Sequence, residues 1–369
     1  MLPSHVRALR AIEHCRTPAL GGHLAECGQC QRQHLLFHSC RNRACPRCGH
    51  ATTQRWLARQ RELLLPVPYF HVVFTLPAEL RQIVRSHQRA LVSVFFRAAF
   101  GSLQALCADP RFVGGKIGAL AVLHTWSRTL EWHPHVHMLV PGGALAPDGR
   151  TWRPVPRRGK RYLVPVKALS KLFRRRFLDL AHRALPRVAF PHIPWSKKWV
   201  VFAKPVVQGA EEVLNYLGRY IHRTAIGDKA LVACDERSVT FRYRNSRTHK
   251  QRVMTLAAHE FLRRFLQHVL PKGMHRVRAF GLLHRHDRAT LRRLQLLLAP
   301  RQAPEPPDVE DKKPRLRCAH CDNAPLRLLR RLTPDQCAHY ASLGATVVTP
   351  KTARARGPPG WNASARSAS

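Results

Sequence analysis

The chain carries, near its middle, the sequence His133-Pro134-His135-Val136-His137-Met138-Leu139-Val140. This run is typical of a buried strand, in which residues two apart point to the same face. His135 and His137 therefore present two imidazoles side by side, and the pair predicts a divalent metal site. The alternative is two structural histidines bonded to backbone groups. A metal would need a third ligand, for which His124 on the preceding predicted strand is the first candidate and His133 the second.

Predicted strands and helices flank this histidine strand on both sides. Their order, which is strand, helix, strand, strand, helix, strand, favours an α+β fold with a central antiparallel sheet and helices on one face. The predicted elements are strands at 69–76, 119–126, 136–140 and 199–206, helices at 78–106, 166–185, 210–222 and 257–270, and a hairpin at 231–245.

Two tyrosines lie about one turn apart in the predicted helix at 210–222. Tyr216 and Tyr220 are neighbours on the helix surface because four residues separate them, and Arg219 beside them has a charge that suits a phosphate. In the alternative interpretation both rings are buried and only their hydroxyls reach solvent.

The charge balance indicates the partner. Sixty-three Lys and Arg residues against 21 Asp and Glu residues give a formal net charge of +42, which points to nucleic acid. Hydrophobic residues form 45% of the chain, which excludes a wholly disordered basic protein. The sequence has no apolar run of about 18 residues and no apolar stretch of signal-peptide length at its start, so we expect a cytoplasmic protein without a membrane partner.

Six of the eleven cysteines fall within the first 48 residues, in a chain without an export signal. This pattern favours metal ligation over disulfides. Four thiolates in two Cys-x2-Cys pairs can complete a tetrahedron around Zn²⁺. The predicted zinc ligands are Cys27, Cys30, Cys45 and Cys48, and the set for a second zinc is Cys15, Cys40, His23 and His38.

Basic residues and a second cysteine cluster provide further candidate sites. Arg41, Arg43 and Arg47 lie between the predicted zinc ligands and are predicted DNA contacts, as is Arg219. Near the carboxyl end, a further zinc module is one interpretation, and a non-binding remnant in a flexible tail is the other. The ligands of that module would be Cys318, Cys321, Cys337 and His339.

These patterns predict five segments. They are a zinc-binding DNA-recognition module at 1–62, an α+β domain at 63–300, to which a family resemblance assigns nuclease activity, a linker at 301–317, a small zinc module at 318–345 and a disordered basic tail at 346–369.

The combined features resemble the HUH (histidine-hydrophobic-histidine) rolling-circle transposases of bacterial insertion sequences, of the insertion sequence 91 type. The resemblance runs from about Cys15 to Leu298. Five stretches carry it in order, namely residues 15–23, 39–43, 66–77, 133–141 and 216–220.

The resemblance implies an HUH nuclease core with Tyr216 and Tyr220 as nucleophiles, and with His135 and His137 holding a catalytic Mg²⁺ or Mn²⁺. It implies that the amino-terminal cysteines hold structural Zn²⁺. The expected activity is nicking and rejoining of single-stranded DNA at element ends and targets, through a 5′-phosphotyrosine, in a bacterial cytoplasm at the nucleoid. A replication initiator or relaxase with the same chemistry, and a non-catalytic zinc-ribbon regulator, are the alternatives.

Overall fold

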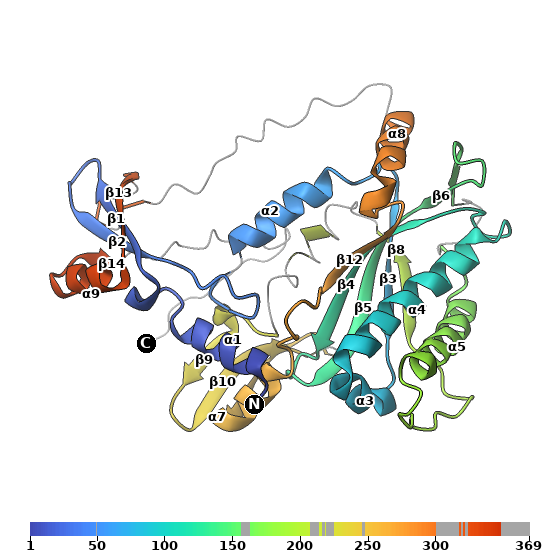
Figure 1. Cartoon of the computed structure of the whole chain (residues 1–369), viewed down its shortest axis with the longest axis horizontal. Helices are drawn as coiled ribbons and strands as arrows, with labels where there is room; N and C mark the ends of the chain where they lie inside the picture. Colours follow the sequence, from blue (N-terminus) through green and yellow to red (C-terminus); the bar gives the residue numbers. More distant parts are fainter. Residues whose placement is uncertain are drawn as a thin grey trace. The chain divides into compact units, whose positions relative to one another are not determined.

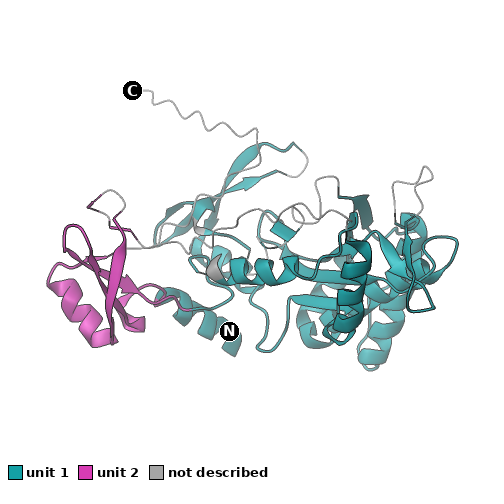
Figure 2. Ribbon diagram, turned by 90° about the horizontal axis from the view of Figure 1, so that it is seen from above, with its two compact units in different colours: residues 1–13, 41–304 teal, residues 14–40, 305–369 magenta. Residues whose placement is uncertain are grey.

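The chain folds into two compact units in the computed structural model, which describes residues 1–48, 50–155, 163–206, 214–215, 218, 225–245, 248–299, 317–318, 320–321 and 324–347. Unit 1 comprises residues 1–13 and 41–304, and unit 2 comprises residues 14–40 and 305–369 (Figure 2). The units do not follow the predicted boundaries, because the predicted module at 1–62 is divided between them and residues 318–345 belong to unit 2. The predicted linker before Arg317 and the predicted tail after residue 347 lie outside the described residues.

A five-stranded antiparallel sheet forms the centre of unit 1 (Figure 1). The strand order is β12-β4-β5-β3-β8, and every neighbouring pair is antiparallel. This confirms the predicted antiparallel sheet and adds a strand, β12, that the sequence patterns do not predict. The strands are β3 (Tyr69–Thr75), β4 (Gly118–Trp126), β5 (Trp132–Pro141), β8 (Val201–Pro205) and β12 (Val277–Gly281).

Two long helices, α4 (Gln88–Ala108) and α5 (Val166–Ala184), pack side by side against one face of this sheet (Figure 1). The single helix predicted at 78–106 is interrupted at His87, whose φ of −115° and ψ of 42° separate α3 (Arg81–Ser86) from α4. Helix α4 is long and apolar enough to cross a membrane, but its apolar residues are buried in the core of unit 1.

Helices also cover the opposite face, which corrects the prediction of helices on one face only. Side chains of α2 (His50–Arg61) and α8 (Arg288–Leu298) form an apolar cluster with Leu120, Val122 and Leu139 of the sheet. The physical reason is the interior strand β4, in which all nine residues are buried. A strand that is apolar on both faces needs cover on both.

Further elements of unit 1 form a separate apolar cluster around a three-stranded antiparallel sheet. The hairpin predicted at 231–245 is confirmed, and its turn begins at Asp235, whose Oδ1 accepts the backbone N–H of Arg237 at 2.8 Å. The elements are α1 (Pro3–Glu13), β9 (Leu231–Cys234), β10 (Ser238–Arg244), β11 (Gln251–Ala257) and α7 (Ala258–Leu266), and a small sheet pairs β6 (Gly143–Leu145) with β7 (Trp152–Pro154).

Unit 2 combines two distant parts of the sequence in one four-stranded sheet of order β13-β1-β2-β14. Helix α9 (Pro334–Ser342) begins with a capping box, in which Thr333 and Gln336 each accept a backbone N–H from the other. The strands are β1 (Gly22–Cys27), β2 (Gln33–Phe37), β13 (Leu326–Leu332) and β14 (Thr346–Val347).

Replacing Phe173 with alanine is expected to lower the free energy of unfolding by about 3–5 kcal/mol. Phe173 is fully buried between sheet and helices, with ring centroids 4.9 Å from Phe74 and 5.4 Å from Trp199. Urea denaturation followed by tryptophan fluorescence measures the change. The control is Leu296→Ala, at a side chain that is 80% exposed, and an equal loss in both variants would contradict the assignment of this core.

Candidate metal centre and nucleic-acid interface

Three histidines meet on the α2 and α8 face of the central sheet. The β4–β5 register sets His124 directly opposite His135, and His137 follows two residues later on the same face. The ring centroids lie 4.1 Å apart for His124 and His137, and 4.9 Å apart for His135 and His137. One nitrogen of each ring lies within 4.8 Å of the others, so the three can bind one metal ion. The structure thus brings together the predicted pair and the first candidate for the third ligand.

Burial keeps these imidazoles neutral. It lowers the pKa of His135 to about 4, and it lowers the pKa values of His124 and His137 well below their usual range, with neighbouring histidines adding to the effect. Neutral imidazole is the form that binds a metal. The Nδ1 of His135 lies 2.7 Å from the carbonyl oxygen of His133, to which it donates, so Nε2 of His135 is the nitrogen left for a ligand.

Two other histidines have supporting positions. Nε2 of His71 on β3 forms a hydrogen bond with Nδ1 of His137 at 2.9 Å, and the sequence patterns do not identify His71 as a site residue. No local pattern identifies it, because the pairing of β3 with β5 brings His71 beside the histidine strand. His133, the second candidate for the third ligand, accepts a 2.7 Å hydrogen bond from Arg81 at Nδ1 and does not belong to the group of three.

The described part of the tyrosine segment packs on this same sheet face. Leu214 is fully buried in the apolar cluster that contains Leu120 and Leu139. Asn215 accepts a 3.2 Å hydrogen bond from Arg61 of α2, and a Cβ on Gly218 would lie 2.9 Å from a methyl group of Leu57. The predicted nucleophiles, Tyr216 and Tyr220, and the predicted DNA contact Arg219 lie outside the described residues.

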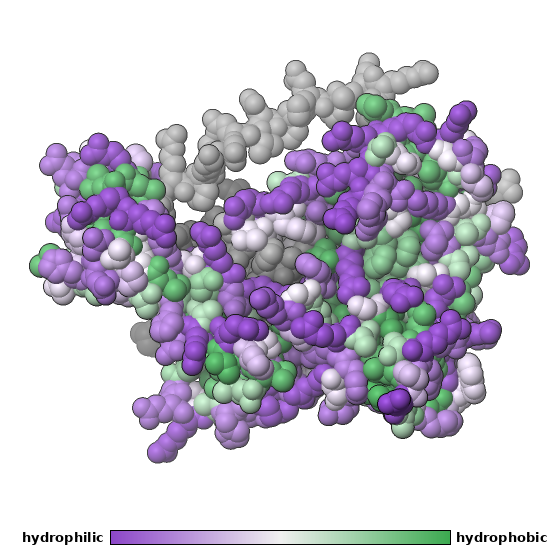
Figure 3. Space-filling view, viewed as in Figure 1, coloured by the Kyte–Doolittle hydropathy of each residue, from purple (hydrophilic) through white to green (hydrophobic). Residues whose placement is uncertain are grey.

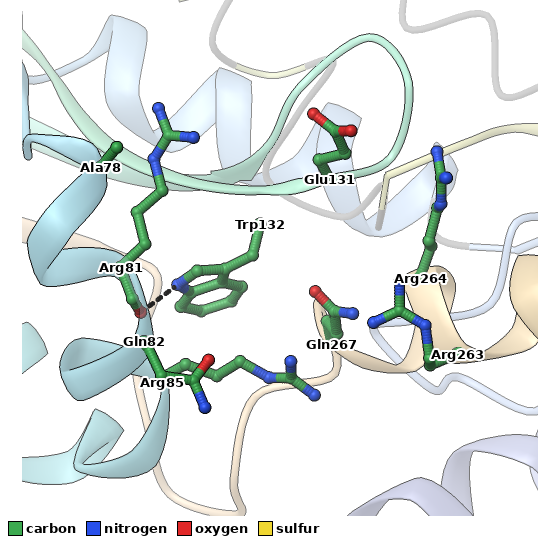
Figure 4. Close-up of a pocket in the computed structure, with 9 residues that line it drawn as sticks. All are labelled: Ala78, Arg81, Gln82, Arg85, Glu131, Trp132, Arg263, Arg264 and Gln267. Carbon is green, nitrogen blue, oxygen red and sulfur yellow. Dashed lines mark hydrogen bonds between the residues drawn. The ribbon is translucent and has the colours of Figure 1, made fainter.

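A basic pocket adjoins the histidine strand (Figure 4). It has a volume of about 290 Å³, and four arginines and one glutamate supply its charges. Arg81 and Arg85 enter from one side and Arg263 and Arg264 from the other, with Trp132 between them. The guanidinium of Arg81 forms a hydrogen bond with His133 and so connects the pocket to the histidine strand. The backbone carbonyl oxygen of Arg81 accepts the indole N–H of Trp132 at 3.1 Å. The arrangement suits an anionic ligand such as a DNA phosphate.

The arginines predicted as DNA contacts from the amino-terminal cysteine region divide into two kinds. Arg41 and Arg47 are exposed, in keeping with the hydrophilic surface that dominates Figure 3. Arg43 instead has a structural role, because its guanidinium donates to the carbonyl oxygens of Leu270, Pro271 and Met274. These hydrogen bonds use donors of Arg43 that a phosphate contact would need, whereas the exposed Arg41 and Arg47 stay predicted DNA contacts.

The first predicted zinc set is also corrected. Cys27 and Cys30 gather with Cys318 and Cys321, and the four Sγ atoms lie within 4.8 Å of one another. All four belong to unit 2, whereas Cys45 and Cys48 belong to unit 1. The two amino-terminal Cys-x2-Cys motifs are close in sequence, and this favoured the prediction that they share one zinc ion. In the structure, however, β1 pairs with β13 from the other end of the chain.

The other predicted zinc sets differ from the structure as well. Cys15 and Cys40 are close, with the backbone N–H of Cys40 3.5 Å from Sγ of Cys15. His23 and His38 contact each other edge to face at 4.9 Å and belong to none of the metal-competent groups among the described residues. Cys337 is buried in the apolar core of unit 2, and His339 lies beside Tyr340, so neither joins Cys318 and Cys321.

A buried histidine group, a basic pocket and cysteine clusters on a strongly basic chain suit a protein that binds nucleic acid and metal ions. Two family models match it, "Putative transposase" over residues 118–290 and "Transposase zinc-binding domain" over residues 1–76. The "Putative transposase y4qJ" of Sinorhizobium fredii (strain NBRC 101917 / NGR234) is 42% identical over 331 residues, which cover 83% of this chain and 82% of the relative.

A second relative is the "Transposase for insertion sequence element IS801" of Pseudomonas savastanoi pv. phaseolicola. It is 29% identical over 293 residues, covering 73% of this chain and 68% of the relative. No solved structure matches the chain. The chain therefore belongs to the insertion sequence 91 type of transposases, which carry an amino-terminal zinc-binding domain, and its partner is DNA.

Proposed function

We propose that the protein nicks and rejoins single-stranded DNA through a 5′-phosphotyrosine, as an HUH nuclease that moves its insertion sequence by a rolling-circle-like mechanism. The observation that carries this proposal is the group of His124, His135 and His137 on the sheet face against which Leu214 packs. Leu214 precedes Tyr216 by two residues in the sequence, and its burial on this face supports a tyrosine nucleophile that acts on the histidine side of the sheet.

The cleavage step transfers a phosphodiester from sugar to tyrosine. The hydroxyl oxygen of Tyr216 or Tyr220 attacks phosphorus and loses its proton, and the bond from phosphorus to the 3′ oxygen breaks. That oxygen takes up a proton and leaves as a 3′-hydroxyl, while the 5′-phosphate stays on the tyrosine. The number of phosphoester bonds is unchanged, so a 3′-hydroxyl can reverse the step without ATP. A second tyrosine allows a second strand to be cut while the first is held.

A tyrosine hydroxyl, with a usual pKa of about 10, is a weak nucleophile at neutral pH and needs activation. A divalent cation on the three histidines would polarise the scissile phosphate and stabilise the charge that develops in the transition state. The donor set is three neutral imidazoles, which suit Mn²⁺ better than Mg²⁺ because Mg²⁺ prefers oxygen ligands. Of the two catalytic ions that the family resemblance implies, the donor set therefore favours Mn²⁺.

The basic pocket is expected to hold the DNA backbone next to the cleavage site. Replacing Arg85 or Arg263 with glutamine should weaken single-strand binding and reduce the slope of log K against log salt by about 0.7 for each phosphate that the variant no longer neutralises. Fluorescence anisotropy over roughly 50–200 mM salt measures that slope. Arg111→Gln removes the same charge at an exposed residue that is paired with Asp109 outside the pocket, and should leave the slope unchanged. Equal slopes in all three variants would show that the pocket does not bind the backbone.

Cleavage of end-labelled single-stranded DNA that carries the element ends tests the proposal directly. We expect a shortened labelled product with a 3′-hydroxyl and a protein-linked fragment that survives boiling and is released by protease. Binding without cleavage in the presence of Mn²⁺ or Mg²⁺ would instead support a non-catalytic DNA-binding protein.

A further inference from the structure

Unit 2 contains four cysteines at one end of its β1–β13 pair. The register sets Cys27, the last residue of β1, opposite Leu326, the first residue of β13. In an antiparallel pair, the chain that leaves β1 and the chain that enters β13 lie at the same end. The two Cys-x2-Cys motifs occupy those two connections, and the pairing therefore brings them together across 288 residues of sequence.

Each motif forms a turn whose backbone N–H groups point at the first cysteine. The N–H groups of Gln29 and Cys30 lie 3.4 and 3.5 Å from Sγ of Cys27. In the second motif, the N–H groups of His320 and Cys321 lie 3.3 and 3.4 Å from Sγ of Cys318. N–H groups directed at a sulfur atom in this way can orient a cysteine that ligates a metal ion.

We propose that Cys27, Cys30, Cys318 and Cys321 bind one Zn²⁺, and that the zinc-binding domain is therefore discontinuous and completed by the carboxyl-terminal segment. A tetrahedron with Zn–S bonds of about 2.3 Å has edges of about 3.8 Å. Sγ of Cys30 lies 3.8 Å from Sγ of Cys318. A disulfide would need about 2.05 Å. The zinc-binding family model ends at residue 76 and does not include the second motif.

The surroundings suit a thiolate-bound cation. Nε2 of the fully buried His34 lies 3.3 Å from Sγ of Cys318 and can donate to it. Cys337 cannot substitute as a ligand, because its Sγ lies near Gly22, at the opposite end of β1 from Cys27. Five residues of strand at about 3.3 Å each separate those ends by roughly 16 Å. The zinc would thus join the two sequence-distant parts of unit 2 at the end where their strands meet.

Zinc content of the full-length chain tests this site independently of DNA cleavage. The double variant Cys318→Ser, Cys321→Ser is expected to contain one zinc equivalent less than the unsubstituted chain, by elemental analysis of purified protein. The matched control, Cys337→Ala, removes a buried cysteine of the same unit and should retain the full content. Unchanged zinc in the double variant, or an equal loss in the control, would overturn the proposal.

If the double variant does not fold, cysteine alkylation of the unsubstituted chain tests the same zinc site. Under native conditions, Cys27, Cys30, Cys318 and Cys321 should resist an alkylating reagent, and a chelator should expose all four together, as read by peptide mass spectrometry. Rapid modification of Cys318 and Cys321 while Cys27 and Cys30 stay protected would assign the zinc to other ligands.

Discussion

Replacing both Tyr216 and Tyr220 with phenylalanine is expected to abolish the covalent protein–DNA adduct, while single-strand binding stays within about twofold. The reason is chemical, because phenylalanine keeps the ring but lacks the oxygen that attacks phosphorus. Each single variant should retain cleavage by the remaining tyrosine but lose strand transfer, which needs both. The measurement is a denaturing gel of labelled single-stranded DNA after boiling in detergent.

Tyr243→Phe is the matched control for this pair. Tyr243 lies on β10 in the three-stranded sheet and packs near Phe241, with ring centroids 6.5 Å apart. Removal of the Tyr243 hydroxyl in this variant should leave adduct formation unchanged. A persistent, protease-sensitive adduct in the double tyrosine variant would remove both residues from the mechanism and leave the histidine group without an assigned nucleophile.

Replacing His124, His135 or His137 with alanine is expected to abolish cleavage and the binding of one catalytic metal ion. Two neutral imidazoles rarely bind a divalent ion when the ion is present at micromolar concentration. Each single alanine variant should therefore behave like the unsubstituted chain treated with a chelator. His71→Leu should have a smaller effect, about 10–100-fold on metal affinity or activity, because it removes the hydrogen bond to His137 and not a ligand. Cleavage rates over a Mn²⁺ titration separate these cases.

His133→Ala discriminates between the two candidates for the third ligand. If His124 is that ligand, the His133 variant keeps its Mn²⁺ dependence, whereas the His124 variant loses it. The reverse result would reassign the ligand to His133 despite its hydrogen bond with Arg81. Undiminished cleavage by the unsubstituted chain in excess chelator, with metal content measured, would make the whole histidine group structural.

Local sequence patterns were sufficient to predict the features that depend on residues close together in the chain, namely individual strands and helices and the faces of their side chains. Alternation along β5 correctly predicts that His135 and His137 share a face, and apolar runs correctly predict β3, β4 and α5. The charge balance predicted a nucleic-acid partner, and the ordered motifs carried the resemblance to the family. Strand β12 was missed because its five residues are all only partly buried and give no apolar run.

Tertiary structure alone decided which distant residues meet. The sequence predicts that Cys27 and Cys30 join the nearby Cys45 and Cys48, but the β1–β13 register brings Cys318 and Cys321 to them instead. His71 and the four pocket arginines were likewise invisible as site residues, because strand pairing and the packing of α3 and α7 bring them beside the histidine strand. Periodicity within an element reports which side chains share a face, whereas contacts between elements depend on how buried surfaces pair, and no local pattern encodes that choice.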